Sequence, residues 1–361
     1  MIAGDSQRIP LKIARDHESR PEEGQSMSAV ADEWRLLPDL ASRVLGGGVV
    51  YANDEFFAEK ENLVKPEPPA FDPAAFGHKG KVYDGWESRR RREPGHDYAI
   101  VRLGCPGIVH GVVVDTAFFR GNYPPEVSVD GACADGYPGP DELAGLDWHP
   151  LVARAAVRGD AANEFAVTDR HRWTYVRLSI YPDGGVARLR VHGEVVADPA
   201  FLSGTVDLAA MENGAVVTDC SDAFYSAPSN LILPGRPRVM SDGWENARRR
   251  GPGNDWVVVR LAGAGVLVWA EVDTSYFVGN APGWIALSGQ EPDQSWRELI
   301  PRTKVRPDTR HRFLIEDPQP TSVVRLDVIP DGGLARLRVH GELTGAALDA
   351  MQRRWQETAP R

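Results

Sequence analysis

The sequence predicts an all-β protein, a tandem duplication of two jelly-roll β-sandwich domains with few short helices. Three observations predict it. The chain repeats itself over most of its length, each copy holds short β-branched runs between turn signals, and few stretches have helical spacing. A chain of 361 residues is too long for one ordinary core and suits two domains. Its 36 glycines and 28 prolines favour turns over long helices.

The duplication is carried by three pairs of matching segments in the same order. They are 39–57 with 207–225 (7 of 19 residues identical), 84–124 with 242–282 (21 of 41) and 177–194 with 325–342 (14 of 18). A period this long indicates two whole domains rather than a solenoid of small units.

The repeat also sets the predicted domain boundaries. They are an N-terminal extension over 1–35, a first repeat over 36–200, a second repeat over 201–345 and a C-terminal helix over 346–361. The extension is polar, lacks the apolar stretch of a signal peptide and is expected to be disordered. Met27 is a second candidate for the true start.

Strands are expected where β-branched residues cluster, as in "DYAIVRL" and "GVVVDTAFF" and their copies. The segment "VARLRVHGE", after a "PDGG" turn, alternates between apolar and polar residues. Its apolar positions should face a core, while Arg188, Arg190 and His192 should share the opposite face. Two short helices are expected to begin at Asp39 and Asp207.

The composition argues against several classes of protein. A net charge of −10 and a pI near 5.5 make a general nucleic-acid binder improbable. Cys105, Cys133 and Cys220 show no paired spacing, which argues against a disulfide scaffold or a thiolate zinc site and fits a reducing cytoplasm. No run approaches the about 18 apolar residues of a membrane span.

The most conspicuous motif occurs twice, as "DGWESRRRREPGHDYAIVRLG" from Asp84 and "DGWENARRRGPGNDWVVVRLA" from Asp242. In a structural interpretation, Trp86 plugs the rim of the sandwich and Glu87 neutralises the arginines that follow. In a functional interpretation, the arginines bind a carboxylate through their rigid forks of donors. If the run is extended, alternate arginines share a face.

Other candidates follow strands. Asp115, Thr116 and Asn122 lie where a strand enters a loop, so they either cap a turn or carry acid–base chemistry. His192 is either a solvated sheet residue or a proton carrier. No HxH or HExxH spacing supports a transition-metal site, so no metal ligands are predicted. A divalent-metal requirement cannot be read from the sequence, because oxygen-ligand sites leave weak signatures.

Together these phrases, with "NDEFF", "VDTAFFRGN" and "IYPDGGVARLRVHGE", resemble the allantoicase family over about residues 36–345. The resemblance implies two galactose-binding-like jelly rolls, a homo-oligomer in the cytoplasm, and hydrolysis of allantoate to ureidoglycolate and urea in purine (allantoin) catabolism. Tyr276 and Val278 depart from the family pattern, in which His and a basic residue are common at these positions. This departure favours a site in the first copy or one shared between copies.

The implied reaction requires a general acid, because a ureido nitrogen leaves poorly unless it is protonated. It also requires a fixed cation for the substrate carboxylate. The predicted catalytic residues are Glu87, Asp115 and His192. The predicted substrate-binding residues are Arg90, Arg92, Asn122, Thr116, Glu245, Arg248 and Asp273.

Two rival interpretations remain. A tandem β-sandwich can be a ligand-binding module without chemistry, and duplication would then serve avidity. The chain could also be an inactive scaffold. Release of urea from allantoate distinguishes an enzyme from either rival.

Overall fold

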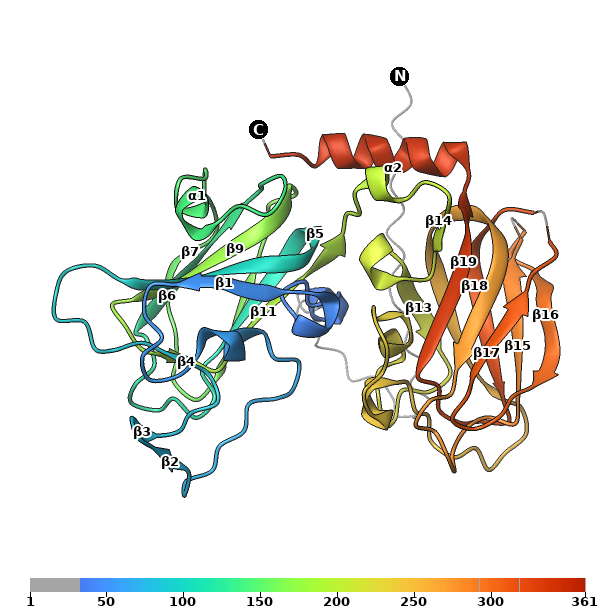
Figure 1. The fold of residues 1–361 in the computed structure, drawn as a ribbon, viewed down its shortest axis with the longest axis horizontal. Coiled ribbons are helices and arrows are strands. Elements are labelled where there is room, and N and C mark those ends of the chain that lie inside the picture. Colours follow the sequence, from blue (N-terminus) through green and yellow to red (C-terminus); the bar gives the residue numbers. More distant parts are fainter. Residues whose placement is uncertain (1–32, 292, 318, 361) are drawn as a thin grey trace, which may run out of the picture. The chain divides into compact units, whose positions relative to one another are not determined.

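The structure is a computed structural model that describes residues 33–291, 293–317 and 319–360 (Figure 1). The described chain forms two compact units, one of residues 33–198 with 353–360 and the other of residues 199–352. Each unit contains one repeat and is described by itself. In the part of the chain described, no helix is both long and apolar enough to cross a membrane.

The first repeat is a seven-stranded antiparallel sheet organised around one long strand, β5 (Asp97–Asp115). Its other strands are β1 (Gly48–Ala52), β9 (Arg172–Tyr181), β6 (Glu126–Ala132), β7 (His149–Ala156), β8 (Ala162–Ala166) and β11 (Arg188–Val195). The first part of β5 pairs with β1 and β9, and the part from Gly107 pairs with β11 and β8. The long strand therefore belongs to both layers of the sandwich.

The second repeat has the same plan around β14 (Asp255–Asp273) (Figure 1). Its other strands are β12 (Thr205–Asp207), β13 (Val216–Cys220), β15 (Trp284–Gln290), β16 (Trp296–Lys304), β17 (Arg310–Leu314), β18 (Thr321–Ile329) and β19 (Arg336–Leu343). Here β13 and β18 pair with the first part of β14, and β19 and β17 with the second. The predicted all-β, duplicated fold class is confirmed.

The remaining elements are short. They are the two-residue strands β2 (Phe76–Gly77), β3 (Gly80–Lys81), β4 (Trp86–Glu87) and β10 (Gly185–Val186), the helix α1 (Pro140–Ala144), and the 3₁₀ helices η1 (Glu33–Leu36), η2 (Arg43–Leu45), η3 (Lys60–Val64), η4 (Pro199–Phe201), η5 (Met211–Asn213), η6 (Pro228–Ile232) and η7 (Met240–Asp242). Of the extension predicted to be disordered, residues 1–32 lie outside the described residues, and residues 33–35 belong to η1.

The predicted short helices are present, but their predicted starts are wrong. η2 and η5 end at Gly46 and Gly214, which take the left-handed conformation (φ 101° and 99°) that favours glycine at this position. Asp207, however, closes strand β12. The side chains of Asp39 and Asp207 accept backbone N–H groups of the neighbouring strand instead of starting a helix. The C-terminal helix α2 spans Gly345–Glu357, close to the prediction.

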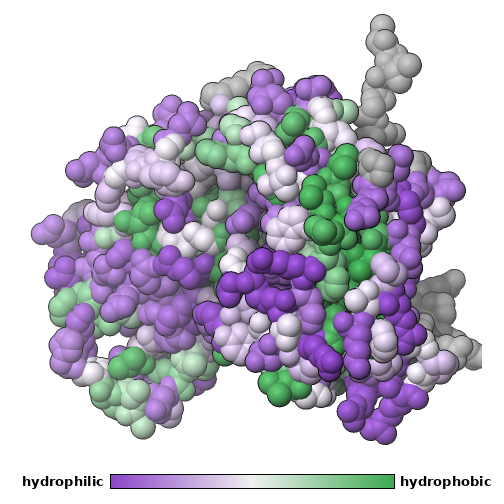
Figure 2. Space-filling model, turned by 45° about the vertical axis from the view of Figure 1, so that its right-hand side comes forward, coloured by the Kyte–Doolittle hydropathy of each residue, from purple (hydrophilic) through white to green (hydrophobic). Residues whose placement is uncertain are grey.

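The alternation in "VARLRVHGE" and its copy places two rows of side chains in the cores. Leu189 and Val191 of β11 are fully buried, as are Leu337 and Val339 of β19. Each such side chain contributes about 1.5–3 kcal/mol through burial. The opposite faces of these strands carry the arginines and histidines. The side of the molecule drawn in Figure 2 is largely hydrophilic, with some hydrophobic areas between. The mean hydropathy of the chain is −0.34.

Candidate functional site

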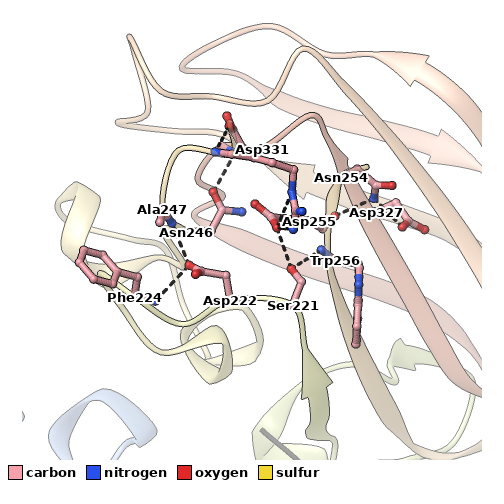
Figure 3. A network of polar contacts seen from close by, with 12 residues as sticks. Ser221, Asp222, Phe224, Asn246, Ala247, Asn254, Asp255, Trp256, Asp327 and Asp331 are labelled. Carbon is pink, nitrogen blue, oxygen red and sulfur yellow. Dashed lines mark hydrogen bonds and ion pairs between the residues drawn. The ribbon is translucent and has the colours of Figure 1, made fainter. Parts of the chain in front are cut away.

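The repeated Trp-Glu-arginine phrase forms a loop that is tied down by short polar contacts. Figure 3 shows this network in the second repeat. The carboxylate of Asp222 accepts the N–H groups of Ala247 (2.8 Å) and Phe224 (3.1 Å). The side-chain oxygen of Asn246 accepts the N–H of Gly332 at 2.9 Å. These contacts fix the path of the loop against the "PDGG" turn.

An arginine at the equivalent position of each run is part of this frame. The guanidinium of Arg249 binds the buried carboxylate of Asp255 (Nε to Oδ1 3.1 Å), and Arg91 binds Asp97 at 2.7 Å in the first repeat. The neighbours Arg90 and Arg92 are exposed, as the expected alternation requires.

The same alternation holds in the second repeat, where Arg248 is exposed. In the described part of the chain, neither Arg90 nor Arg92 nor Arg248 has a hydrogen bond or ion pair from its side chain, and each remains a prediction as a substrate-binding residue. Arg91 and Arg249 are thus explained by the fold.

Glu87 contacts an amide rather than an arginine. Its Oε1 accepts a hydrogen bond from Asn122 Nδ2 at 2.7 Å, and burial raises the pKa of the Glu87 carboxyl. The copy, Glu245 with Asn280, has the same contact at 2.5 Å. The structure therefore brings together Glu87 and Asn122, two of the predicted site residues.

Asp115 and Thr116 make the contacts of a turn. The carboxylate of Asp115 accepts the N–H of Ala117 at 2.8 Å. Thr116 is fully buried and donates its hydroxyl to the carbonyl of Arg158 at 2.6 Å. Both residues brace the loop that follows β5, which is the structural interpretation of this position.

His192 lies apart from Asp115. Asp115 is opposite Arg188 in the β5–β11 pair, and His192 is four residues further along β11, about 13 Å away at roughly 3.3 Å per residue. Its Nδ1 is 2.9 Å from the carbonyl oxygen of Leu37, and its ring lies beside Trp34. His192 and Asp115 therefore do not contact each other.

A pocket of about 220 Å³ lies on the polar face of the second repeat, large enough for a small organic acid. It is lined by Asp207, Gly235, Arg236, Trp269, Glu271, Asp273, Arg310, Arg312, Arg336, Arg338 and His340. Of the predicted site residues, Asp273 belongs to this lining. His340 is the counterpart of His192.

The lining residues form three cross-strand rows over β12, β19, β14 and β17. The rows are Asp207–His340–Trp269, then Arg338–Glu271–Arg312, then Arg336–Asp273–Arg310. Residues directly opposite each other in an antiparallel pair have Cβ atoms about 5 Å apart on the same face. The sheet thus presents four arginines, three carboxylates and a histidine together.

Two arginine nitrogens in this pocket are left without partners. Arg336 is only 5% exposed, and its Nε has no hydrogen-bond partner in the described chain. Nη1 of Arg338 is likewise buried and unpaired. Burial lowers the pKa of Arg336 to about 10, although it remains cationic at neutral pH. Leaving buried donors unpaired costs about 1–3 kcal/mol each, so a bound anion is favoured here.

Two titratable groups at one end of the pocket have pKa values displaced by burial, that of Asp207 upward and that of His340 downward. Burial raises the pKa of Asp207 to about 6, against the opposing effect of Arg338, whose Nε is 3.5 Å from its Oδ2. Burial lowers the pKa of His340, whose imidazole stacks on the indole of Trp269 with ring centroids 3.8 Å apart. Such groups in a charged pocket are candidates for proton transfer.

No metal site is evident from the geometry. Among residues 33–291, 293–317 and 319–360, no group of three or more His, Cys, Asp or Glu side chains lies in a position to hold a metal ion. The lining of the second-repeat pocket is dominated by arginine, a donor that does not ligate metal ions.

Sequence reasoning missed most of this pocket. It identified the alternating arginines and histidine of one copy but treated them as a sheet face. The signal that was available is the difference between copies: Trp269 and Glu271 stand where the first copy has Gly111 and Val113. A large aromatic and an acid at alternate positions of a strand indicate a face that is not simply core.

The fold and pocket define a class: a tandem-repeat β protein with a pocket lined by arginine, carboxyl and imidazole groups. A family model for the allantoicase repeat matches residues 38–196 and 206–344. The chain belongs to the allantoicase family.

Individual relatives agree with this assignment. The chain is 59% identical over 319 residues to a probable allantoicase of Nocardia farcinica, covering 86% of this chain and 95% of the relative. It is 40% identical to the allantoicase of Dictyostelium discoideum, covering 84% and 87%. The crystal structure of Saccharomyces cerevisiae allantoicase matches with a TM-score of 0.76 at 36% identity, covering 88% of this chain and 98% of that one.

Proposed function

We propose that this chain hydrolyses allantoate to ureidoglycolate and urea, and that the reaction takes place in the second-repeat pocket. Relatives named as allantoicases at up to 59% identity support the activity. The observation that carries the location is the pair of buried, unpartnered nitrogens on Arg336 and Arg338, which line the same pocket as Asp207. No comparable unpaired donors occur on the matching arginines of the first repeat, Arg188 and Arg190.

Binding follows from the charges. Allantoate is an anion, and Arg338 offers its carboxylate a charge-assisted contact in a buried setting. The ureido groups carry both donors and acceptors. Asp273 and Glu271 can accept from ureido N–H groups, and Arg310 can donate to a ureido oxygen. The three rows thus match a small acid with two polar arms.

Proton transfer is assigned to Asp207. In the first step its protonated carboxyl donates to the departing ureido nitrogen while the carbon–nitrogen bond breaks, and the remaining ureido nitrogen stabilises the resulting N-acyliminium carbon. In the second step water adds to that carbon, and the Asp207 carboxylate takes back a proton. Atoms and charge balance, because one proton leaves Asp207 and one returns. A pKa of about 6 suits a group that must serve as acid and then as base.

A matched pair of variants tests the location. Asp207→Asn should reduce the turnover number for urea release by about 100- to 10,000-fold, the usual contribution of a general acid. Asp39→Asn is the control, because Asp39 makes the same backbone contacts in the first repeat without lining the pocket. Equal turnover in both variants and wild type would exclude the pocket.

The predicted loop site is tested in the same assay. If Glu87 handles the proton, Glu87→Gln should lose activity by a similar factor while Asp207→Asn retains it. The pocket proposal expects the reverse. The chosen site therefore differs from the first-copy site that the Tyr276 and Val278 departures favoured, and both of these residues are absent from the pocket lining.

We further propose a homo-oligomer in the cytoplasm, which rests on the family resemblance alone. Light scattering on the purified chain would test the assembly, and a monomer at working concentration would contradict it. The rival binding-module interpretation predicts allantoate binding without urea release. Repeating the urea assay after chelation tests whether a divalent metal is needed.

A further inference from the structure

The first repeat contains a counterpart of the pocket face, but different residues stand at several of its positions. Its three rows are Asp39–His192–Gly111, Arg190–Val113–Glu164 and Arg188–Asp115–Ala162. The β19 residues that line the pocket, two arginines and a histidine, therefore have identical counterparts in β11. The partner strands do not match: where the second repeat has Trp269, Glu271, Arg310 and Arg312, the first has Gly111, Val113, Ala162 and Glu164.

The space above Gly111 is filled from elsewhere in the chain. A Cβ atom added to Gly111 would lie 2.2 Å from the indole of Trp34, so that ring is packed directly on the strand. The same indole lies 5.6 Å from the ring of His192. Next to it, Arg35 forms an ion pair with Glu164, the residue that replaces Arg312. The 3₁₀ helix η1 therefore covers, in the first repeat, the face that the described residues leave open in the second.

The arginines below this cover are satisfied by their own chain. Arg188 donates to Oδ2 of Asp84 at 2.6 Å and to the carbonyl of Glu67 at 3.0 Å. Arg190 contacts the Asp39 carboxylate at 3.3 Å and the carbonyl of Pro66 at 3.3 Å. Their counterparts make similar backbone contacts, Arg336 with the carbonyl of Asp242 at 2.6 Å and Arg338 with that of Gly235 at 2.8 Å. Each of these two arginines nevertheless retains one buried nitrogen without a partner among the described residues. An anion entering the first repeat would have to displace existing partners, whereas in the second repeat it gains contacts.

We propose that the chain binds one substrate molecule, in the second repeat, and that the first repeat holds a closed counterpart of the pocket covered by Trp34. This rests on the proposed function for its ligand class, a small ureido carboxylate. The duplication has therefore produced one working pocket and one structural domain. The difference lies in three features of the first repeat: the indole cover, the absence of counterparts of Arg310 and Arg312, and the internal pairing of Arg188 and Arg190.

The test is a binding stoichiometry with a ligand that does not react. Hydantoate carries a carboxylate and one ureido group on the same carbon, and it has no second ureido group to lose. Equilibrium dialysis of the full chain against labelled hydantoate should give one site per chain. Two equal sites per chain would overturn the proposal.

Matched variants identify which repeat holds the site. Arg338→Gln and the more exposed Arg310→Gln should each weaken hydantoate binding about 10- to 100-fold, the worth of one charge-assisted hydrogen bond. Arg190→Gln, the first-repeat counterpart of Arg338→Gln, should leave it within about twofold. Circular dichroism confirms that each variant is folded.

Removal of the cover is a second, independent test. Trp34→Ala should leave urea release and the single hydantoate site unchanged, because the working pocket is in the other repeat. Loss of turnover in folded Trp34→Ala would overturn the proposal. Different results would contradict the proposed substrate site and the closed counterpart in the first repeat. Hydantoate binding that is unaffected by both pocket variants contradicts the proposed site, whereas two sites with only one lost in Arg338→Gln contradict only the closed counterpart.

Discussion

At the scale of single residues, Asp207 combines a structural and a chemical task. Its Oδ1 accepts the N–H groups of Ala209 (3.1 Å) and Val339 (2.9 Å), which ties β12 to β19. Its Oδ2 faces Arg338. The first task needs only a side-chain oxygen, and an asparagine supplies it. The second task needs a carboxyl group that can lose and regain a proton.

The burial of Asp207 has a cost in stability that depends on pH. Its pKa rises from 3.8 when unfolded to about 6 when folded, so the folded state disfavours the ionised form. Below pH 3.8 the carboxyl is protonated in both states and carries no penalty. The penalty grows between pH 3.8 and 6 and is constant above, at about 3 kcal/mol.

Asp207→Asn should therefore raise the free energy of unfolding by about 1–3 kcal/mol at pH 7 while it abolishes most turnover. Near pH 4 the gain should vanish. Urea denaturation of wild type and variant at both pH values measures it. A variant that is less stable than wild type at pH 7 would show that the carboxylate is held favourably in the folded state.

The same pKa predicts a pH profile for catalysis. The kcat/KM for urea release reports the free enzyme, which must have Asp207 protonated for the first step. It should fall about tenfold per pH unit above about pH 6. The decline of kcat should begin at a higher pH than the decline of kcat/KM, because the bound substrate anion favours the protonated carboxyl of Asp207. A kcat/KM that rises through pH 6 would indicate that the ionised form starts the reaction.

At the scale of elements, the repeated arginine run is divided between fold and surface. The side chain of Arg249 holds the buried Asp255, and its backbone N–H donates to the carboxylate of Asp331, whereas Arg248 is exposed. The loop therefore depends on the middle arginine. This explains why the phrase occurs in both repeats although only one repeat has an open pocket.

Arg249→Gln should destabilise the second repeat by about 1–3 kcal/mol, less than the figure for a fully buried pair because the arginine is partly exposed. Arg248→Gln, its neighbour, should change stability by less than about 0.5 kcal/mol. Thermal unfolding of the two variants compares them directly. Equal melting temperatures would contradict the structural role of the middle arginine.

The strand patterns in the sequence were enough to predict the fold and part of the candidate site. The duplication and the alternation in "VARLRVHGE" predicted the fold class and the polar face of β11 and β19. Asp207 was misassigned to a helix start, because an aspartate before an apolar run has the same signature whether it caps a helix or bridges strands. Whether a polar face is open depends on distant residues, here Trp34 over Gly111, and such contacts leave no trace in local spacing.

At the scale of the whole molecule, duplication supplies two equivalent frames that diverge in what they display. The cores keep identical rows of leucine and valine, and both long strands bend between layers. The divergence lies in β14 and β17 against β5 and β8, which carry the residues facing outward. A duplicated fold can thus conserve its framework while one copy acquires the charge pattern needed for a ligand.

The central claim is that the substrate occupies the second-repeat pocket. The most direct measurement is a crystal structure of the full chain with hydantoate. We predict one ligand per chain, with its carboxylate on Arg338 and its ureido group beside Asp207 and His340. Ligand density beside Glu87 and Asn122, or in the first repeat beneath Trp34, would contradict the account.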